Sequence, residues 1–545
     1  MAQFVKLDPE ALRELHVGNE RLVSYNVEMA EVTGGTFWKA YTPEQIAGTE
    51  PFEMKGGLNA NIFAEGGLMQ YYDPIDLYDE KLRTLAKEIG PSWVRVSGSW
   101  ATKTYYDFDG HTGGKVPEGY GAVLNRQQWV GVLDFCKTVG AKLLISVADC
   151  EGLHHADEPW NPSQAQQIFA FSQAYGKPID AVEFVNEPNL LEMSGCPKGY
   201  TPELYAKNQD IFARWLRENY PDCLFVGTST SEGTSNSDPA YESAGDSNSF
   251  LKNVPLEVLL KGMQEKLDVY SYHYYNGVAE RLRAMMPNSY WLPDRAASED
   301  YLDVARSMVQ YHTEKRDIYC PGGEIWVTES GDAGGGGTTW ASTYLDVFRT
   351  LNELGAFCTV TKGIIFHNTL ASSDYGFLSH GSFDPRPNYF AVLLWHRLMG
   401  STAYDTAEPI REGAHVYAHS RADGKPGKVS LEKPSEIEYL LTLPASVIEE
   451  ADDAASLFHM MNGNTFTCGV LHLKDAGQLD AAAGEVKTYV MNTQWMCGFP
   501  DKLVVASLDG YLISVFGAEN LVDTFRDKLQ TAYPGTQIVS DDPIA

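Results

Sequence analysis

Residues 79–97 read DEKLRTLAKEIGPSWVRVS, and this stretch contains one unit of the repeating pattern that decides the fold. Its first part, DEKLRTLAKEIG, places apolar residues at helical spacing and closes on a glycine, a residue that commonly ends a helix. WVRVS follows as a short run of aromatic and β-branched residues, which is typical of a buried strand. The stretch therefore predicts a helix followed directly by a strand.

The same alternation extends in both directions, over residues 21–400. The strand candidates are VSYNVE (23–28), WVRVS (93–97), KLLISVA (142–148), AVEFVN (181–186), LFVGT (224–228), LDVYSYH (267–273), EIWVTE (324–329) and GIIFHN (363–368). The helix candidates between them include DEKLRTLAKEIG (79–90), NRQQWVGVLDFCKTVG (125–140), TPELYAKNQDIFARWLRENY (201–220) and TTWASTYLDVFRTLNELG (338–355). Eight strands, each followed by a helix, predict a (β/α)8 TIM barrel, an α/β fold whose active sites lie at the C-terminal ends of the strands. An open doubly wound sheet would need a glycine-rich phosphate loop after its first strand, and VSYNVEMAEVTGG offers none.

The rest of the chain is predicted to flank this barrel. We expect residues 1–20 to add a strand to a small β-sandwich, residues 21–400 to form the barrel, residues 401–449 to form a sandwich segment, and residues 450–545 to form a small α+β unit of unknown role. The connection 29–78 after the first strand is unusually long and would lie on the active-site face, where it would shape a substrate cleft.

Individual elements are also predicted for the C-terminal part. We expect HVYAHS (415–420) and EIEYLLTL (436–443) to be strands that pair with FVKL (4–7). The residues that follow predict a helix over 451–461, a strand over 467–473, a helix over 480–492, a hairpin over 502–517 and a helix over 518–535. The Asp509-Gly510 pair between two apolar runs indicates a type I′ turn in that hairpin.

Composition excludes several classes of protein. The 73 acidic and 42 basic residues give a formal charge of -31, which repels polyanions, so we expect no binding of nucleic acid. The eight cysteines include no CxxC pair, which predicts reduced, buried thiols rather than disulfides or a zinc site. The N-terminus has no apolar signal region, and no stretch approaches eighteen apolar residues. We therefore expect no membrane contact and a cytoplasmic location, unless a secretion signal has been removed.

Two glutamates stand where barrel active sites form. Glu187, in VEFVNEPNLLE, directly follows the fourth strand, and Pro188 ends that strand and redirects the chain. Glu329, in GEIWVTESGDAGGGG, closes the seventh strand and would face Glu187 across the barrel mouth. Either glutamate alone could be a solvated rim residue, but a pair about 5–5.5 Å apart would suit a retaining glycoside hydrolase. We therefore predict Glu329 as the nucleophile and Glu187 as the acid/base.

Neighbouring residues complete the candidate site. Asn186 could hydrogen-bond a sugar hydroxyl next to the reacting carbon. In YSYHYYNG, strand alternation places His273 and Tyr275 on one face, where a tyrosine could hold the nucleophile ionised. The two histidines of CEGLHHAD (150–157) have no further ligands at matching spacing. We therefore predict no metal, and the chemistry requires no cofactor.

The chain resembles glycoside hydrolase family 79, the heparanase and β-glucuronidase family. The stretches that carry the resemblance are KLRTLAKEIGPSWVRVSGSWATKTYYDF (81–108), VEFVNEPN (182–189), YHYYNG (272–277), IWVTESGDAGGGG (325–337) and DYGFLSHGSFDPRPNYFAVLLWHRLMG (374–400). The Asn-Glu-Pro motif is shared by a whole clan of barrel hydrolases. The glycine run after Glu329, together with FDPRPNYF, narrows the resemblance to this family.

The resemblance implies a barrel with a flanking β-sandwich and the hydrolysis of β-linked uronic acid residues with retention. It also implies that backbone N–H groups of Gly335 and Gly336, together with Tyr375, bind the substrate carboxylate. A bare glycine backbone lets an anion approach closely, which agrees with that role. Glu28 and Ser99 fall where the family contacts the sugar. Because the chain lacks the basic clusters needed to grip a sulfated polymer, we expect removal of a terminal glucuronic acid from a small or neutral conjugate.

Three alternatives stay open at this point. Another β-glycosidase of the same clan, such as a β-xylosidase or β-glucosidase, would keep both glutamates but would not need a carboxylate site. A non-catalytic carbohydrate-binding barrel would bind without turnover. The C-terminal unit could instead be the functional centre, as an interaction module. The sequence carries no prediction of the oligomeric state.

Overall fold

The computed structural model describes residues 12–52, 67–231, 254–407, 413–421, 431, 434–458, 466–495 and 499–544. The chain divides into two compact units, Met1–Ala422 and Asp423–Ala545. Separate clusters of buried apolar side chains stabilise the two units, so each is described by itself.

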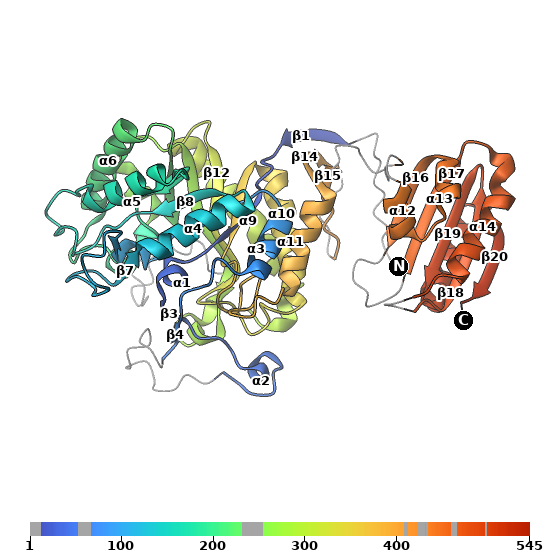
Figure 1. The fold of residues 1–545 in the computed structure, drawn as a ribbon, viewed down its shortest axis with the longest axis horizontal. Coiled ribbons are helices and arrows are strands. Elements are labelled where there is room, and N and C mark those ends of the chain that lie inside the picture. Colours follow the sequence, from blue (N-terminus) through green and yellow to red (C-terminus); the bar gives the residue numbers. More distant parts are fainter. Residues whose placement is uncertain are drawn as a thin grey trace. The chain divides into compact units, whose positions relative to one another are not determined.

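The first unit contains a closed barrel of eight parallel strands (Figure 1). They are β2 (Val23–Asn26), β5 (Trp93–Val96), β8 (Lys142–Ser146), β9 (Ala181–Glu183), β10 (Leu224–Thr230), β11 (Val269–Val278), β12 (Glu324–Gly334) and β13 (Gly363–His367). Each strand pairs with the next one in this order, and β13 pairs with β2 to close the barrel. The predicted TIM barrel is confirmed, and all eight of its strands lie where the sequence places them.

Helices form the outer layer of the barrel. They are α3 (Glu80–Glu88), α4 (Arg126–Val139), α5 (Ser163–Ala174), α6 (Pro202–Asn219), α8 (Leu256–Lys261), α9 (Glu299–Tyr319), α10 (Leu345–Val360) and α11 (Pro387–Leu398). Local signals set their ends: at α4, the Asn125 side chain accepts a 3.0 Å hydrogen bond from the Gln128 N–H, and Gly140 ends the helix with a φ of 70°. In the part of the chain that the structure describes, none of the helices has both the length and the apolar character to cross a membrane.

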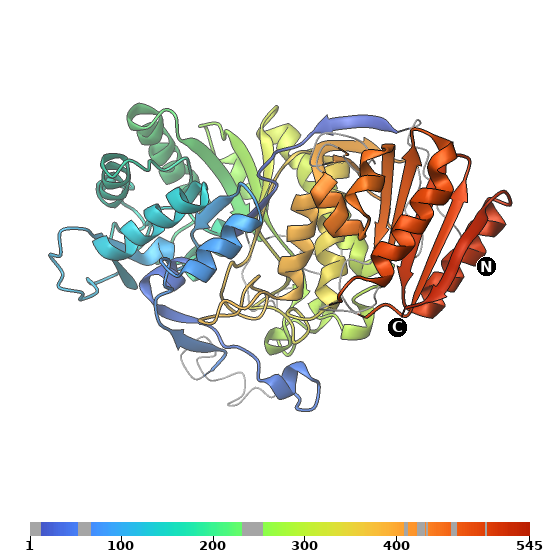
Figure 2. The ribbon, with the colours of Figure 1, turned by 45° about the vertical axis from the view of Figure 1, so that its right-hand side comes forward.

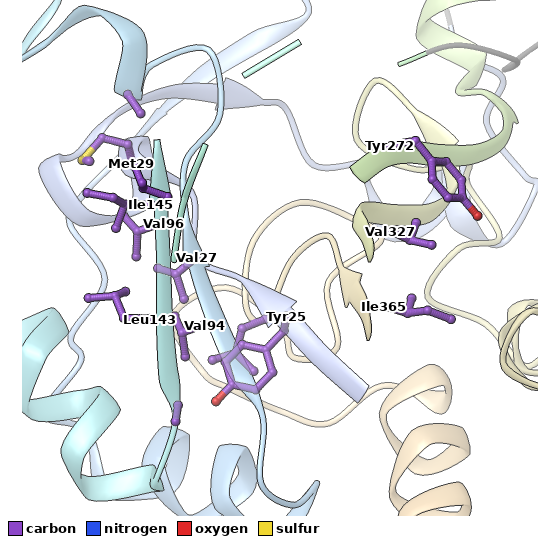
Figure 3. Close-up of a cluster of buried hydrophobic side chains, with 14 of the residues drawn as sticks. Tyr25, Val27, Met29, Val94, Val96, Leu143, Ile145, Tyr272, Val327 and Ile365 are labelled. Atoms are coloured by element: carbon purple, nitrogen blue, oxygen red, sulfur yellow. The ribbon is translucent and has the colours of Figure 1, made fainter. Parts of the chain in front are cut away.

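Side chains of the barrel strands alternate between two apolar layers. The layer inside the barrel consists of Trp93, Leu144, Ala181, Val226, Val269, Trp326, Ile364 and Phe366. Val94 and Leu143, the sequence neighbours of two of these residues, belong instead to the cluster shared with the helices (Figure 3). This alternation follows from the period of two in a β-strand. Further toward the C-terminal ends of the strands, the inward side chains become polar, and there the candidate site forms.

The long connection after β2 has secondary structure of its own. It contains α1 (Met29–Thr33), β3 (Gly35–Trp38), α2 (Pro43–Ile46) and β4 (Met69–Tyr72), and β3 pairs antiparallel with β4. A Cβ atom added at Gly336 would lie 2.5 Å from that of Trp38, so the connection borders the glycine run that follows β12. The remaining short elements of this unit are β6 (Thr104–Asp107), β7 (Ala122–Asn125), η2 (Ala101–Lys103), η3 (Pro188–Ser194), η4 (Glu280–Leu282), η5 (Pro287–Ser289) and η6 (Pro293–Arg295).

A small antiparallel sheet completes the first unit. Its strands are β1 (Arg13–Val17), β14 (Met399–Asp405) and β15 (Ala418–Arg421), in the order β1-β14-β15. The predicted strand FVKL lies outside the described residues. The strand predicted over 436–443 is wrong, because these residues fall largely within α12 (Pro434–Leu441) of the second unit. Ile437 and Leu441, four residues apart, are both buried there, and this helical spacing outweighs the short alternation that suggested a strand.

The second unit is a five-stranded antiparallel sheet with helices on both faces. Its strands are β16 (Ala451–Phe458), β17 (Phe466–Leu473), β18 (Lys502–Leu508), β19 (Tyr511–Gly517) and β20 (Gln537–Pro543), in the order β16-β17-β19-β18-β20. One face shares its core with α12, α13 (Ala445–Glu449) and α14 (Leu479–Met491), which Figure 2 shows lying over the sheet. The other face packs against α15 (Glu519–Ala532). The short turn η7 (Ala476–Gln478) precedes α14.

Most of the elements predicted for this unit are confirmed. The β18–β19 hairpin turns at Asp509 and Gly510, whose φ angles of 45° and 90° are those of a type I′ turn. The helix predicted over 451–461 is wrong, because residues 451–458 form β16 at an edge of the sheet. Its alanines favour a helix locally, but pairing with β17 overrides that preference. The edge strand β20 was not predicted.

Candidate active site

The predicted site residues come from six barrel strands or from the segments that follow them. Glu28 follows β2, Ser99 follows β5, Asn186 and Glu187 follow β9, His273 and Tyr275 lie in β11, Glu329 lies in β12, Gly335 and Gly336 follow β12, and Tyr375 follows β13. Because the C-terminal ends of parallel barrel strands meet at one mouth, residues far apart in sequence come together there.

Glu187 and Glu329 lie close to each other at this mouth. One carboxylate oxygen of each, together with a ring nitrogen of His273, forms a group whose atoms all lie within 4.8 Å of one another. The Glu187 side chain is 17% exposed and that of Glu329 is 8% exposed. Both carboxylates are therefore held by the protein while part of each remains accessible from outside.

The backbone at Glu187 departs from the strand that precedes it. Its φ of 46° and ψ of 55° are left-handed, which is uncommon for a residue with a side chain and costs on the order of 1 kcal/mol or more. Two hydrogen bonds hold this conformation: the Glu187 N–H donates to the Ser229 carbonyl at 3.1 Å, and the Ser194 hydroxyl donates to the Glu187 carbonyl at 2.6 Å. Pro188 then begins η3, so Glu187 stands at a fixed turn out of the barrel wall.

A β-bulge sets the direction of Glu329. In the pairing of β11 with β12, Tyr272 lies opposite Val327. The next residue of β11, His273, lies opposite Glu329, so Thr328 has no partner of its own. An extra residue of this kind changes which way the following side chains point. Thr328 and Glu329 both reach polar partners inside the barrel, which strict alternation would not allow.

Each oxygen of the Glu329 carboxylate accepts a hydrogen bond from a buried donor. Arg95 Nη1 donates to Oε1 at 3.0 Å, and the Tyr275 hydroxyl donates to Oε2 at 2.7 Å. Burial and the charge of Glu329 raise the pKa of Tyr275 well above its usual value, so its phenol keeps the proton that it donates. The two hydrogen bonds restrict the carboxylate to one orientation.

His273 connects the two carboxylates. Its Nδ1 lies 3.0 Å from Oε1 of Glu187, and its Nε2 lies 3.4 Å from Nη2 of Arg95. An arginine nitrogen can only donate, so Nε2 accepts and the ring proton is assigned to Nδ1. His273 is thereby placed to donate to Glu187.

Two buried charges at the base of the site were missed by the sequence reasoning. Arg95 of β5 and Glu183 of β9 form an ion pair at 2.6 Å, with side chains 0% and 1% exposed. The signal for them was a single charged residue inside each of the apolar strands WVRVS and AVEFVN. A charge is almost never buried in a strand without a partner, so each of them required one.

The other residues predicted to contact a sugar also lie at this mouth. The Asn186 side chain accepts a 2.6 Å hydrogen bond from Arg95 and donates a 3.4 Å one to the Ser99 hydroxyl. Glu28 is buried, and one of its oxygens has no hydrogen-bond partner among the described residues. Burial, reinforced by the charge of Glu329, raises the pKa of Glu28 well above its usual value.

The glycine run 334–337 lies beside the loop that carries Tyr375. The φ angles of Gly335 and Gly336 are 90° and 92°, a region that favours glycine. The Gly336 carbonyl accepts hydrogen bonds from the Ser373 hydroxyl at 2.9 Å and the Asp374 N–H at 3.2 Å. Within the described ranges, the N–H groups of Gly335 and Gly336 have no acceptor of their own. Two successive unpaired N–H groups of this kind can bind an anion.

Tyr375 connects this glycine run to the carboxylate pair. Its ring stacks on that of Tyr275 with centroids 6.3 Å apart. The Asn368 side-chain amide donates to both hydroxyls, at 3.1 Å to Tyr375 and 2.9 Å to Tyr275. The Asn368 amide therefore links Tyr375 to Tyr275, whose hydroxyl binds Glu329.

The histidines after β8 take part in ion pairs. His154 Nε2 lies 2.5 Å from the Asp149 carboxylate, and His155 pairs with Glu151. In the part of the chain that the structure describes, the group spaced like metal ligands is the pair of glutamates with His273. Arg95 and Tyr275 already bind the carboxylate of Glu329, and His273 binds that of Glu187. These hydrogen bonds explain why the three side chains lie close together, and a metal is not needed to explain it.

Comparison with known proteins gives relatives at low identity. No family model matches the chain. It is 25% identical over 366 residues to heparanase-like protein 1 from Arabidopsis thaliana, covering 63% of this chain and 62% of the relative. It is 31% identical over 131 residues to baicalin-β-D-glucuronidase from Scutellaria baicalensis, covering 24% of this chain and 25% of the relative. The matches therefore span less than two thirds of the length of either relative.

Among solved structures, the chain is similar to a family 51 α-L-arabinofuranosidase from Bifidobacterium longum, with a TM-score of 0.45 and 12% identity, covering 93% of this chain and 96% of that one. The two curated relatives confirm the resemblance to heparanase-like proteins and β-glucuronidases.

Proposed function

We propose that this protein is a retaining glycoside hydrolase that removes β-linked glucuronic acid, with Glu329 as nucleophile and Glu187 as acid/base. The observation that carries the proposal is the approach of their carboxylate oxygens to within 4.8 Å. Retaining enzymes hold the two carboxyl groups about 5–5.5 Å apart, whereas inverting enzymes leave about 6.5–9.5 Å for a water molecule. The short separation favours direct attack by a carboxylate.

In the first step, Glu329 attacks the anomeric carbon while the bond to the glycosidic oxygen breaks. Glu187 gives its proton to that oxygen, and the aglycone leaves as a neutral alcohol or phenol. Arg95 and Tyr275 hold the Glu329 carboxylate in position for the attack. His273 donates to Oε1 of Glu187, which leaves Oε2 to carry the transferred proton.

In the second step, water releases the sugar from Glu329. Glu187, now a carboxylate, takes one proton of the water, and the oxygen attacks the anomeric carbon as the bond to Glu329 breaks. Two displacements at the same carbon give a product with the β-configuration of the substrate. Glu187 regains its proton, and the site returns to its starting state.

The preference for a uronic acid rests on the glycine run. The unpaired N–H groups of Gly335 and Gly336 can receive the substrate carboxylate, and Tyr375 lies beside Gly337 of the same run. The relatives named heparanase-like protein and baicalin-β-D-glucuronidase support the same substrate class. The net charge of -31 disfavours a sulfated polymer, so we propose a terminal glucuronic acid on a small or neutral aglycone. A β-xylosidase or β-glucosidase would use the same glutamates but would leave the anion site without a role.

The test is the release of nitrophenol from a panel of nitrophenyl β-glycosides. We expect turnover of the glucuronide, with a loss of about a hundredfold or more in Glu329→Ala and in Glu187→Gln. Glu324→Gln is the matched control, because Glu324 begins the same strand at the opposite end of the barrel, and its activity is expected to stay within about twofold of wild type. Azide separates the two roles, since it can replace the missing nucleophile in Glu329→Ala and yields the α-glycosyl azide. Turnover of a xyloside or glucoside instead would contradict the proposal that the substrate is a uronic acid. A folded protein that turns over none of the glycosides would contradict the proposed hydrolase activity.

A further inference from the structure

Glu183 is a buried carboxylate at the active site for which the proposed mechanism has no chemical step. It is the last residue of β9, four positions before Glu187. Its side chain is 1% exposed and lies beneath the residues that a sugar could reach. Burying a charge costs several kcal/mol unless partners compensate for it, so its position requires an explanation.

Four hydrogen bonds fix this carboxylate. Oε1 accepts from Arg95 Nε at 3.1 Å, from Arg95 Nη2 at 2.6 Å and from the Ser97 hydroxyl at 2.6 Å. Oε2 accepts from the Ser229 hydroxyl at 2.5 Å. The carboxylate and its partners come from β5, β9 and β10 and from the residue after β5, so three barrel strands hold it in place.

Further hydroxyls hold those partners. Ser97 is 2.8 Å from Ser146 at the end of β8, and Ser229 is 2.8 Å from Ser271 of β11. Thr328 of β12 donates to Ser229 at 3.2 Å. A ring of small hydroxyl side chains thus surrounds Glu183 and restricts its movement. A fully hydrogen-bonded polar network in a buried site makes the position of each member well defined.

Arg95 transmits this fixed position to the reacting groups. Its Nε–Nη2 edge binds Glu183, its Nη1 binds the nucleophile Glu329, and its Nη2 also binds Asn186. A guanidinium group is planar and rigid, so fixing one edge also fixes the direction of the remaining nitrogen. Without Glu183, the group could rotate within its plane and leave Glu329 without its donor.

We propose that Glu183 is a positioning residue for the hydrolysis: through Arg95 it fixes the orientation of the nucleophile Glu329 and of Asn186. This inference rests on the proposed function. Small displacements of a nucleophile from its line of attack cost large factors in rate. Since Glu183 does not reach the sugar, its loss should lower kcat and leave KM nearly unchanged.

The first experiment compares Glu183→Gln with Glu183→Ala. Glutamine keeps the shape and the acceptor for Arg95 but removes the charge, and we expect kcat to fall about tenfold. Alanine removes both, and we expect a fall of about a hundredfold or more, with KM within about threefold in either variant. The matched control is Asp346→Asn, which weakens a similar buried pair with Arg349 on α10. If the control loses as much kcat as Glu183→Gln, the effect is general destabilisation and the proposal is overturned.

A double-mutant cycle tests whether Glu183 acts through Arg95. If it does, Arg95→Gln combined with Glu183→Gln should lose no more kcat than Arg95→Gln alone. Losses that multiply would show that Glu183 acts by another route and would overturn the proposal. If Glu183→Ala does not fold, the pair Ser97→Ala and Ser229→Ala removes two of the four hydrogen bonds, and we expect a threefold to tenfold loss of kcat, roughly as for removing modest hydrogen bonds. An unchanged kcat in this pair would contradict the proposal.

A crystal structure of Glu183→Gln gives a readout that does not need turnover. The distance from Arg95 Nη1 to Glu329 Oε1, 3.0 Å in the wild type, is expected to lengthen or its geometry to worsen. An unchanged Arg95 together with an unchanged kcat would overturn the positioning role. Failure of the proposed function is a separate result: it is the absence of glycoside turnover by the wild type, whereas the structure of the variant still tests the positioning of Arg95.

Discussion

The hydroxyl of Tyr275 donates a 2.7 Å hydrogen bond to Oε2 of Glu329. The same hydroxyl accepts a 2.9 Å hydrogen bond from the Asn368 amide, so its own proton is directed at the carboxylate. The ring is buried against Tyr375, which keeps water from competing for that proton. This relationship makes Tyr275 the donor whose removal most simply tests how the Glu329 carboxylate is held.

Replacing Tyr275 by phenylalanine should therefore lower kcat about tenfold to a hundredfold, since a hydrogen bond to a charged group contributes about 1.5–3 kcal/mol. The measurement is the rate of nitrophenol release from the nitrophenyl glucuronide. Tyr274→Phe is the control, since the Tyr274 hydroxyl binds Asn276 instead. A kcat for Tyr275→Phe that stays within about twofold of wild type would contradict this role.

The buried carboxyl group of Glu31 should make the free energy of unfolding depend on pH. Burial raises the pKa of Glu31 to about 8 from its usual 4.5. Between these values the folded protein keeps a proton that the unfolded chain has lost, so the free energy of unfolding falls as the pH rises, by up to about 1.4 kcal/mol per pH unit. Glutamine does not titrate. Glu31→Gln should thus become more stable relative to wild type from pH 5 to pH 8, with a constant difference at higher pH.

Urea unfolding followed by tryptophan fluorescence checks this expectation for the first unit, because Trp495 is the single tryptophan of the sequence after residue 422. A difference between the two proteins that does not change with pH would show that Glu31 is already ionised in the folded state.

Gly336→Ala should weaken the binding of the glucuronide. The new Cβ would lie 2.5 Å from that of Trp38 and 2.6 Å from the Ser373 hydroxyl, at a φ of 92°. We expect KM to rise about tenfold or more, equivalent to about 1.4 kcal/mol of binding. Gly381→Ala is the matched control, because Gly381 also has a positive φ, of 78°, but no atom within 4 Å of an added Cβ. Both variants carry the backbone strain of a positive φ. An equal rise of KM in the two would therefore show that this strain, and not the loss of the anion site, weakens binding.

The second unit should fold by itself. Both faces of its sheet are covered, one by α12, α13 and α14 and the other by α15, so it has two apolar layers of its own. Residues 423–545 produced alone are expected to unfold cooperatively on heating, as measured by circular dichroism. Val505→Asp is the control, since Val505 is fully buried and the variant should show no transition. A gradual, non-cooperative melt of the wild-type segment would contradict its independence.

The sequence predicts the barrel because each strand and helix carries its own local signals. Apolar runs mark the eight strands. Capping residues mark the ends of the helices between them, as Asn125 and Gly140 do for α4. The same signals failed at residues 451–458, where an alanine-rich stretch is a strand only because β17 lies beside it. That pairing is non-local, and no window of the sequence contains it.

The sequence by itself thus determined the barrel topology and the two glutamates, since residues near the C-terminal end of a parallel barrel strand lie at the common mouth. Only the tertiary structure decided which charges meet beneath them. Arg95 of β5 and Glu183 of β9 are separated by β8, and their contact depends on strand register around the barrel. The direction of Glu329 depends in the same way on the bulge in β12. Register and bulges are set by the packing of the whole barrel, which is why the individual strands did not reveal them.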